Sequence, residues 1–496
     1  MKKQWIWLCA LLMCVQSTVS MTACASIGGS QNSTDTEKQD SNTADTADNA
    51  TAAEQYRADL PDDLDYNGAP FNIVVYDNSN STWYDVDFSA TGIDGTTIND
   101  AAYQRMRAVE QMLNVDIVAK PSPGFGFSAI HQSVRTDEGD YHVGFVCTRS
   151  AINLAESGFL WDLNEIETLD IDAPWWDQNA ARDLTVGDKL YMMTGDISIM
   201  YKKSIGVLLF NKQMIEDNHL ENPYQLVKDH KWTIDKFNEM ASSVSKDLNG
   251  DSQYDLEDRY GLLYYCDMIA MGMIGAGTQF TVKDDQDYPV LTFYNDRTQT
   301  IFDKYIDIMY DPQQSVSWSR LGKTNDEIIA MFQAGQGLFN YNEFHAIENM
   351  RKSDLQFGIL PMPLYDESQE DYHHIINPHV AAMLLVPKDC PDVDMTGYVL
   401  DALGAESKNT LTPAYYDQYL KSKGAKDTES AAMLDLIFDT MTYDIGYLYD
   451  FGGLPGMLLN MVNQYDKDLA SNYEAYESMA TEAIRSMIEA YQSHED

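Results

Sequence analysis

The feature that most constrains the fold is a strand, helix, strand alternation in the first half of the chain. Three runs rich in β-branched and aromatic residues are typical of buried strands: "FNIVVY" (71–76), "VDIVA" (115–119) and "YHVGFVC" (141–147). Apolar residues recur at helical spacing over 98–114, between the first two runs, and we expect Thr97 to cap this helix. Such units fold into a mostly parallel sheet flanked by helices, so the sequence predicts an α/β fold.

The length of the chain predicts more than one lobe. Its 496 residues exceed what a single core usually organises, so we expect at least two lobes. Further apolar strands are expected at 204–211, 357–363 and 380–387, and helices from Ser430 to the end.

The first 60 residues predict export and a lipid anchor. "MKK" precedes a short apolar run, and Met21-Thr22-Ala23-Cys24 resembles the lipobox of bacterial lipoproteins. We therefore expect a signal peptide over 1–23 and lipidation of Cys24; the alternative is an ordinary signal peptide cut nearby. Residues 24–60 are rich in Ser, Thr, Asp, Asn and Ala, and we expect them to form a disordered tether to the extracellular face of a bacterial membrane.

Charge and cysteine content exclude several classes of protein. Lys and Arg number 33 against 78 Asp and Glu, a formal charge of −45, which would repel nucleic acids and anionic lipid surfaces. The cysteines beyond the N-terminal segment, Cys147, Cys266 and Cys390, are too widely spaced for a disulfide framework or a metal-ligand motif.

Several segments, in order, resemble the family 1 extracellular solute-binding proteins, the receptors of ABC-type sugar importers. The matching segments are "APWWDQNAARDLTVGDKLYMMTGD" (173–196), "VLLFNKQMIED" (207–217), "NPYQLVKDHKWTIDKF" (222–237), "FGILPMPLYDESQEDY" (357–372) and "MLDLIFDTMTYDIG" (433–446). The resemblance runs from about Phe71 to the C-terminus.

This resemblance implies a two-lobed, periplasmic-binding-protein-like fold of type II, with mostly parallel sheets and a hinge between the lobes. Lobe one would comprise 61–205 and 362–410, and lobe two 206–361 and 411–496. It further implies a monomeric receptor that traps a carbohydrate in the cleft and delivers it to ABC permease subunits. We expect the ligand to be an oligosaccharide; the alternative is another polar small-molecule solute.

An acidic stretch, "KDLNGDSQYDLEDRYG" (246–261), has the spacing of an EF-hand loop. Positions 1, 3, 5, 7, 9 and 12 are taken by Asp247, Asn249, Asp251, Gln253, Asp255 and Asp258. The stretch departs from that pattern at position 6, which is Ser252 rather than Gly, and at position 12, which is Asp rather than Glu. We expect a structural Ca²⁺ here; the alternative is a solvated acidic turn.

Aromatic and polar residues near the ends of expected strands are the candidate ligand contacts, because sugars bind through aromatic platforms and planar hydrogen-bonding groups. The candidates are Asp77, Asn78, Trp83, Tyr84, Thr148, Arg149, Trp175, Trp176, Trp318, Tyr341, Glu343, Phe344 and His379. Asn377 lies beside the last of these. Of the adjacent pair Trp175 and Trp176 we expect only one to line the cleft, and Trp232 is expected to pack in the core.

The sequence lacks the common catalytic motifs: there is no G-x-S-x-G, H-E-x-x-H or P-loop. "GMIGAG" (272–277) lacks a recognisable preceding strand and is expected to be a helix end entering a glycine turn. We therefore expect a binding protein and no catalytic residue. The alternatives are a secreted glycosidase, which needs only two suitably spaced carboxylates, and a calcium-dependent surface adhesin.

Overall fold

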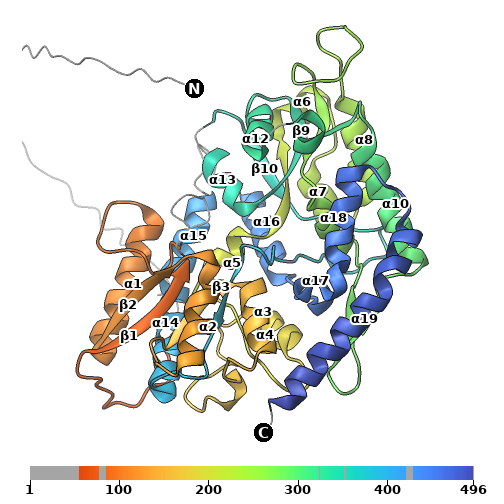
Figure 1. Ribbon diagram of the computed structural model, residues 1–496. Helices are drawn as coiled ribbons and strands as arrows, with labels where there is room; N and C mark the ends of the chain where they lie inside the picture. The colour runs from red at the N-terminus through yellow and green to blue at the C-terminus, as the bar shows by residue number, and fades with distance from the viewer. Residues whose placement is uncertain (1–54, 77–84, 323, 351–352, 421–427, 495–496) are drawn as a thin grey trace, which may run out of the picture. The chain divides into compact units, whose positions relative to one another are not determined.

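A four-stranded sheet forms the first lobe of the protein (Figure 1). The computed structural model describes residues 55–76, 85–322, 324–350, 353–420 and 428–494. The strand order is β11 (Ala382–Leu385), β3 (Val143–Cys147), β1 (Ala69–Tyr76), β2 (Val115–Ser122). β1 pairs in parallel with β2 and β3, and β11 joins the edge of β3 in the antiparallel direction. The expected strands are thus confirmed. The apolar side chains of β1 and β3 are buried on both faces, whereas Val118 and Ala119 of β2 are only partly buried.

The helices that accompany this sheet come from two separate parts of the chain, 97–184 and 393–420. They are α1 (Thr97–Leu113), η1 (Gly124–Gly126), α2 (Phe127–Thr136), α3 (Thr148–Glu156), η2 (Leu163–Glu165), α4 (Gln178–Leu184), α14 (Val393–Asn409) and α15 (Leu411–Leu420). The expected cap of α1 is wrong by one residue. Thr96 holds the N-cap position in extended conformation, and its hydroxyl bonds Asp94 instead of the helix.

A five-stranded mixed sheet forms the second lobe. Its order is β10 (Phe357–Leu360), β4 (Gly206–Asn211), β9 (Gly337–Glu343), β5 (Tyr260–Tyr264), β8 (Ser315–Ser317). β5 is parallel to β8 and β9, whereas β4 is antiparallel to β9 and β10. A separate hairpin, β6 (Thr281–Lys283) and β7 (Pro289–Leu291), follows α9 in sequence.

The helices that precede β4 or connect the strands of this sheet in sequence are mostly short. They are α5 (Met200–Lys203), α6 (Lys212–Asp217), α7 (Pro223–Lys228), α8 (Ile234–Val244), α9 (Met268–Gly275), α10 (Asp296–Tyr310), α11 (Trp318–Leu321), α12 (Asn325–Gln333) and α13 (Phe344–Met350). Thr233 caps α8, and the preceding Trp232 is fully buried, as expected, with its indole N–H donating to the Pro361 carbonyl at 3.0 Å.

The glycine-rich end of α9 is a helix end, as expected. Gly277, just beyond it, has φ +86°, a conformation that favours glycine. The expectation that no strand precedes this helix is wrong, because β5 ends four residues before α9 begins.

Three chain segments cross between the lobes and lie side by side. Ile205, just before β4, pairs with Ile376, which lies between β10 and β11. His374 in the same segment pairs with Met441, between α16 and α17. The backbone N–H of Asn377 donates to the Ser204 carbonyl at 3.1 Å, so the first two crossings are directly hydrogen bonded.

The C-terminal segment is helical, as expected, and touches both lobes. It comprises α16 (Thr428–Asp439), α17 (Ile445–Tyr449), η3 (Phe451–Gly453), α18 (Leu454–Gln464) and α19 (Leu469–Ser493). α19 contacts α3 of the first lobe and α10 of the second. α15 packs against α1 and α14, so the expected assignment of all of 411–496 to lobe two does not hold for this helix. In the part of the chain that the structure describes, no helix combines the length and apolar character that crossing a bilayer requires.

Candidate functional site

Polar side chains from both lobes and from a crossing segment meet at the carboxyl ends of strands. Asp267 lies three residues beyond β5, and Glu343 is the last residue of β9. The Asn377 side-chain amide donates to both carboxylates, at 2.7 Å to Glu343 Oε1 and 3.2 Å to Asp267 Oδ2. Ligands of open α/β sheets bind at this end of the strands. The strand-end cluster is defined here as Arg149, Tyr265, Asp267, Tyr341, Glu343, Asn377 and Tyr447.

The two carboxylates of the cluster disfavour each other's charge. Burial and the neighbouring Glu343 raise the pKa of Asp267 to about 7, although the Asn377 amide and the Cys266 thiol lower it somewhat. Glu343 is 4% exposed, and His345 Nδ1 lies 3.3 Å from its Oε2. Asp267 therefore sits in a site that favours an additional positive charge or a proton.

The positive charge that the first lobe contributes is already paired. Arg149 follows β3, and its guanidinium lies 3.7 Å from Asp450 Oδ2 and donates to the Tyr447 carbonyl at 3.4 Å. Burial lowers the pKa of Arg149, and Asp450 opposes that shift. His379 lies nearby; part of its surface reaches solvent, while partial burial of the ring and the positive charge of Arg149 lower its pKa.

Aromatic rings enclose the two carboxylates. The Tyr265 and Tyr341 ring centroids are 5.0 Å apart, and Trp318, which follows β8, meets Tyr265 edge-on at 6.2 Å. The Tyr265 hydroxyl bonds Glu343, and burial raises the pKa of both tyrosines. Trp318 is only half-buried, so its ring remains available to a ligand.

The structure brings together five of the thirteen candidate ligand residues: Arg149, Trp318, Tyr341, Glu343 and His379. Asp77, Asn78, Trp83 and Tyr84 lie outside the described residues. Thr148 and Phe344 are fully buried and serve the fold: the Thr148 hydroxyl donates to the Ala381 carbonyl at 3.2 Å, and Phe344 packs against Phe438.

The expectation that one of Trp175 and Trp176 lines the cleft is wrong. Their exposures are 4% and 3%, and both indole N–H groups donate to Asp401 Oδ1, at 3.2 and 3.1 Å. The argument that sequence neighbours diverge applies to strands and helices. These two residues lie in a turn, where both rings reach one acceptor.

Four cluster residues or neighbours were not among the candidates: Tyr265, Asp267, Tyr447 and Asp450. For the first two a signal was present, because "YGLLYYCD" is a buried strand followed by polar residues. Tyr447 and Asp450 belong to α17 and its end, and they reach the cluster only through the way that the C-terminal segment packs on α3.

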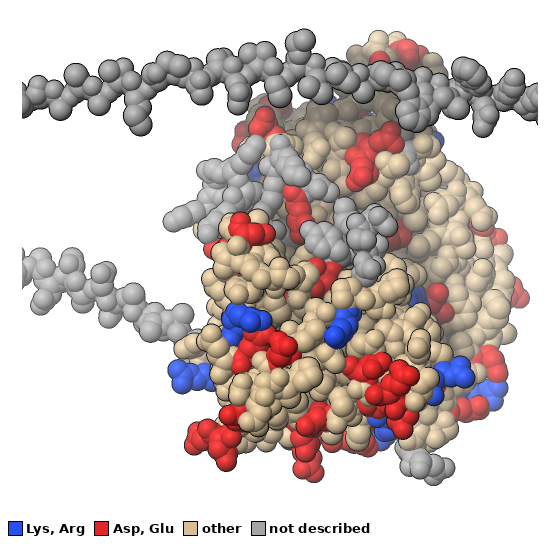
Figure 2. Space-filling view, turned by 60° about the vertical axis from the view of Figure 1, so that its left-hand side comes forward, with Lys and Arg blue, Asp and Glu red and all other residues tan. Residues whose placement is uncertain are grey.

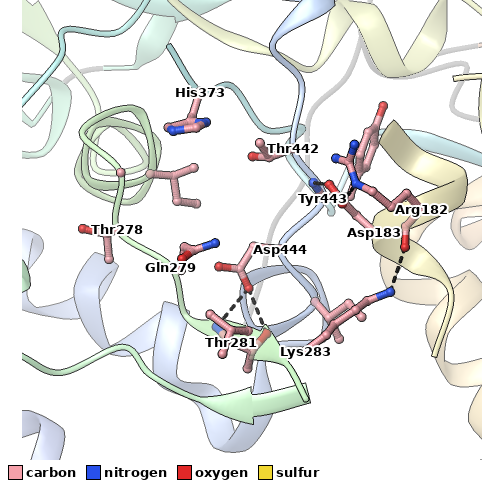
Figure 3. A pocket seen from close by; sticks show the side chains of 14 residues that line it. Arg182, Asp183, Thr278, Gln279, Thr281, Lys283, His373, Thr442, Tyr443 and Asp444 are labelled. Carbon is pink, nitrogen blue, oxygen red and sulfur yellow. Dashed lines mark hydrogen bonds and ion pairs between the residues drawn. The ribbon is translucent and has the colours of Figure 1, made fainter. Parts of the chain in front are cut away.

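A cavity of about 400 Å³ lies apart from the strand-end cluster (Figure 3). It is lined by Arg182 and Asp183 of α4, by residues between Ile274 and Lys283, by His373, and by 442–445. Its carboxylates are already used within the protein: Asp444 accepts the Phe280 N–H at 2.5 Å, and Asp183 accepts the Tyr443 N–H at 3.0 Å. No cluster residue lines this cavity, and α9, about 12 Å long, leads from Asp267 toward it. The strand-end cluster is preferred as the candidate site because most of its residues lie at the carboxyl ends of β3, β5 and β9, where ligands of open α/β sheets bind.

The acidic stretch 247–258 forms a loop whose carboxylates accept backbone hydrogen bonds. Asp247 accepts from Gly250 and Ser252, and the fully buried Asp258 accepts from Leu248 and Asp255. Among the described residues, no three His, Cys, Asp or Glu side chains lie close enough together to hold a metal ion. The loop's own hydrogen bonds account for its conformation, and calcium binding stays a prediction.

Comparison with known proteins identifies the fold. No model of a known protein family matches the chain, and no curated protein matches it either. Among solved structures, the chain is similar to the sugar transporter RHE_PF00321 from Rhizobium etli in an open conformation (12% identity, 84% of this chain and 99% of that chain, TM-score 0.56). It is also similar to UgpB from Mycobacterium tuberculosis in complex with glycerophosphocholine (15%, 85% and 99%, TM-score 0.55).

A third similar structure is the ABC substrate-binding protein Lmo0181 from Listeria monocytogenes in complex with cycloalternan (12% identity, 85% of this chain and 99% of that chain, TM-score 0.54). At these identities the likeness establishes the fold. This chain has the two-domain α/β fold of maltose-binding-like periplasmic binding proteins, and the sequence-based prediction of that fold is confirmed.

Proposed function

We propose that this protein is the extracytoplasmic receptor of an ABC importer, and that it binds a carbohydrate at the strand-end cluster between its lobes. The observation that carries the proposal is the contact of Asn377, on a crossing segment, with the carboxylates of Asp267 and Glu343, beside the tilted ring pair of Tyr265 and Tyr341. Carboxylates and amides accept and donate to sugar hydroxyls, and tyrosine and tryptophan rings cover apolar sugar faces.

The position of the cluster supports a receptor that closes on its solute. Arg149 belongs to the first lobe, Asp267 and Glu343 to the second, and Asn377 to the segment between them. A ligand that touches all three favours the arrangement in which they converge, and this differential contact is what closure requires. Proteins of the same fold include the sugar transporter from Rhizobium etli and the cycloalternan-bound protein from Listeria monocytogenes, which supports a carbohydrate as the solute.

The proposal includes export and anchoring through lipid on Cys24, which lies outside the described residues, with permease subunits as partners. It also includes a structural calcium ion at 247–258. Binding of the ion to the folded state alone would stabilise the protein by mass action.

A glycosidase is the second candidate, and one observation favours it. Because Asp267 Oδ2 and Glu343 Oε1 both bond one nitrogen, they lie no more than about 6 Å apart, and retaining glycosidases hold two carboxyl groups about 5 Å apart. The raised pKa of Asp267 would suit a general acid. Two of the structures with this fold, from Rhizobium etli and Listeria monocytogenes, are described as a sugar transporter and a substrate-binding protein, which favours the receptor.

The test is calorimetric titration of the full chain, made lipid-free by Cys24→Ser, with a panel of soluble oligosaccharides. We expect one glycan class to bind with one-to-one stoichiometry and to be recovered intact by mass spectrometry. Glu343→Gln should weaken that binding. The control Glu474→Gln, at an exposed position of α19, should not. A cleaved glycan would make the protein an enzyme, and binding only to insoluble polymer would indicate an adhesin.

A further inference from the structure

The strand-end cluster holds more negative charge than positive charge. The ionisable groups that face it are Asp267 beyond β5, Glu343 of β9, Arg149 of α3, Asp450 beyond α17, His345 of α13 and His379 beside Asn377. Arg149 is paired with Asp450, so it does not neutralise the two carboxylates that share Asn377. A neutral amide bridges them instead, and an amide donates hydrogen bonds without supplying charge.

The rings around these carboxylates suit a cation. Tyr265, Tyr341 and Tyr447 are buried beside Asp267 and Glu343, and the faces of aromatic rings attract ammonium groups. The Tyr341 hydroxyl is fully buried; the Tyr265 side chain hydrogen bonds to it, and both tyrosines lie beside Glu343. A ligand bearing an ammonium group would supply the positive charge that the carboxylates lack.

The whole protein also favours a positively charged ligand. Its formal charge is −45, and on the face shown in Figure 2 patches of acidic side chains cover more of the described surface than basic ones do. Such a field raises the local concentration of cations and repels anions during approach.

We propose that the carbohydrate bound at this site carries a protonated amine, and that its ammonium group pairs with the carboxylate of Asp267, beside the Asn377 amide that bridges it to Glu343. The inference rests on the proposed carbohydrate-binding function and names the class of sugar: an amino sugar whose nitrogen is not acetylated. It also assigns Asp267, which the sequence analysis did not select, as the residue that determines specificity.

Other occupants fit the cluster less well. A sugar acid or a phosphorylated sugar would place a third negative charge beside the carboxylate pair. A neutral sugar would satisfy hydrogen bonds but would leave two partly desolvated carboxylates without a counter-ion. A divalent cation prefers six or more oxygen ligands, and no group of three metal-binding side chains occurs in the described part of the chain.

The test compares three trisaccharides of one length and linkage: the β-1,4-linked trimers of glucosamine, of N-acetylglucosamine and of glucose. Affinities are measured by calorimetry on the full chain at pH 7.5, above the pKa of about 7 of the Asp267 carboxyl, so that Asp267 is mostly ionised. We expect the glucosamine trimer to bind at least tenfold more tightly than the acetylated trimer, because acetylation removes the charge and keeps the ring. In Asp267→Asn this preference should fall severalfold, and in the control Glu474→Gln it should be unchanged.

The outcomes separate the inference from the function on which it rests. If the neutral or acetylated trimer binds as tightly as the glucosamine trimer, the ammonium inference is wrong and the carbohydrate receptor stands. If ethanolamine, which has an ammonium group and no sugar ring, binds as tightly as the glucosamine trimer, the cation site stands and the carbohydrate function is wrong. If no amine binds, the inference is overturned. Glu343→Gln provides the same test should Asp267→Asn fail to fold.

Discussion

Replacing Asp401 by alanine should destabilise the protein through the two buried tryptophans rather than through any ligand. Asp401 Oδ1 is the acceptor for the indole N–H groups of Trp175 and Trp176, and its Oδ2 accepts the Asp170 N–H at 2.8 Å. Both indoles are almost fully buried, so no water can replace the lost acceptor without repacking.

The size of the effect follows from the number of donors left unpaired. A buried donor without a partner costs about 1–3 kcal/mol, so two indoles predict a loss of roughly 2–6 kcal/mol in the free energy of unfolding. Asp401→Asn keeps the Oδ1 acceptor but presents its NH₂ group to the Asp170 N–H. It should lose only about 1–2 kcal/mol, and the expected order of stability is wild type, Asn, Ala.

The assay is urea denaturation followed by circular dichroism and by tryptophan fluorescence, with the slope of each transition compared between variants. Ligand affinity, measured in parallel, should be the same in Asp401→Asn as in wild type. A loss below about 1 kcal/mol in the alanine variant would refute the argument that the carboxylate is the essential partner of both indoles. Reduced ligand affinity in the asparagine variant would indicate that Trp175 and Trp176 contribute to the ligand site.

Three further predictions concern charge, metal and anchoring. Burial raises the pKa of Asp267 to about 7, above its ordinary 3.8, so the folded state binds the proton more tightly than the unfolded state does. The free energy of unfolding should therefore fall as pH rises from about 4 to 7. In Asp267→Asn this decrease should be smaller. Calcium should raise the melting temperature by several degrees over EDTA, and Asp247→Ala should abolish the difference; equal melting temperatures would leave a solvated acidic turn. Cys24→Ser should move the protein from the membrane to the soluble fraction, and an unchanged distribution would exclude lipidation as the anchor.

The strands of the first lobe could be predicted from sequence because their information is local. In β1 and β3, a run of β-branched and aromatic residues buried on both faces is itself the signal, and the helix between β1 and β2 has the apolar spacing of one buried face. The cap of α1 was misplaced by one residue. Two adjacent threonines offer the same chemistry, and it is the extended backbone of Thr96 that makes it the N-cap residue.

The candidate site could be predicted only in part because its contacts are long-range. Arg149 and Glu343 follow or end strands, and the strand-end rule finds such positions. Asp267 acquires its importance from Asn377, which is 110 residues away in sequence and on a different segment. The prediction for Trp175 and Trp176 was wrong for a similar reason. Asp401, the acceptor of both indole N–H groups, lies more than 220 residues beyond them in sequence.

The position of Asn377 explains why a costly carboxylate pair can occur in an otherwise well-packed protein. Its backbone N–H is held by Ser204 on the first crossing segment, while its side chain holds both carboxylates of the second lobe. A ligand that satisfies Asp267 and Glu343 therefore acts directly on the segment about which the lobes would move. If the pair were neutralised internally by a lysine, the unliganded protein would be more stable, but ligand binding would contribute less to closure. Under the proposed function, a charge left for the ligand to balance would make closure depend on the ligand, and Asn377→Ala is the variant that should weaken binding without removing either carboxylate.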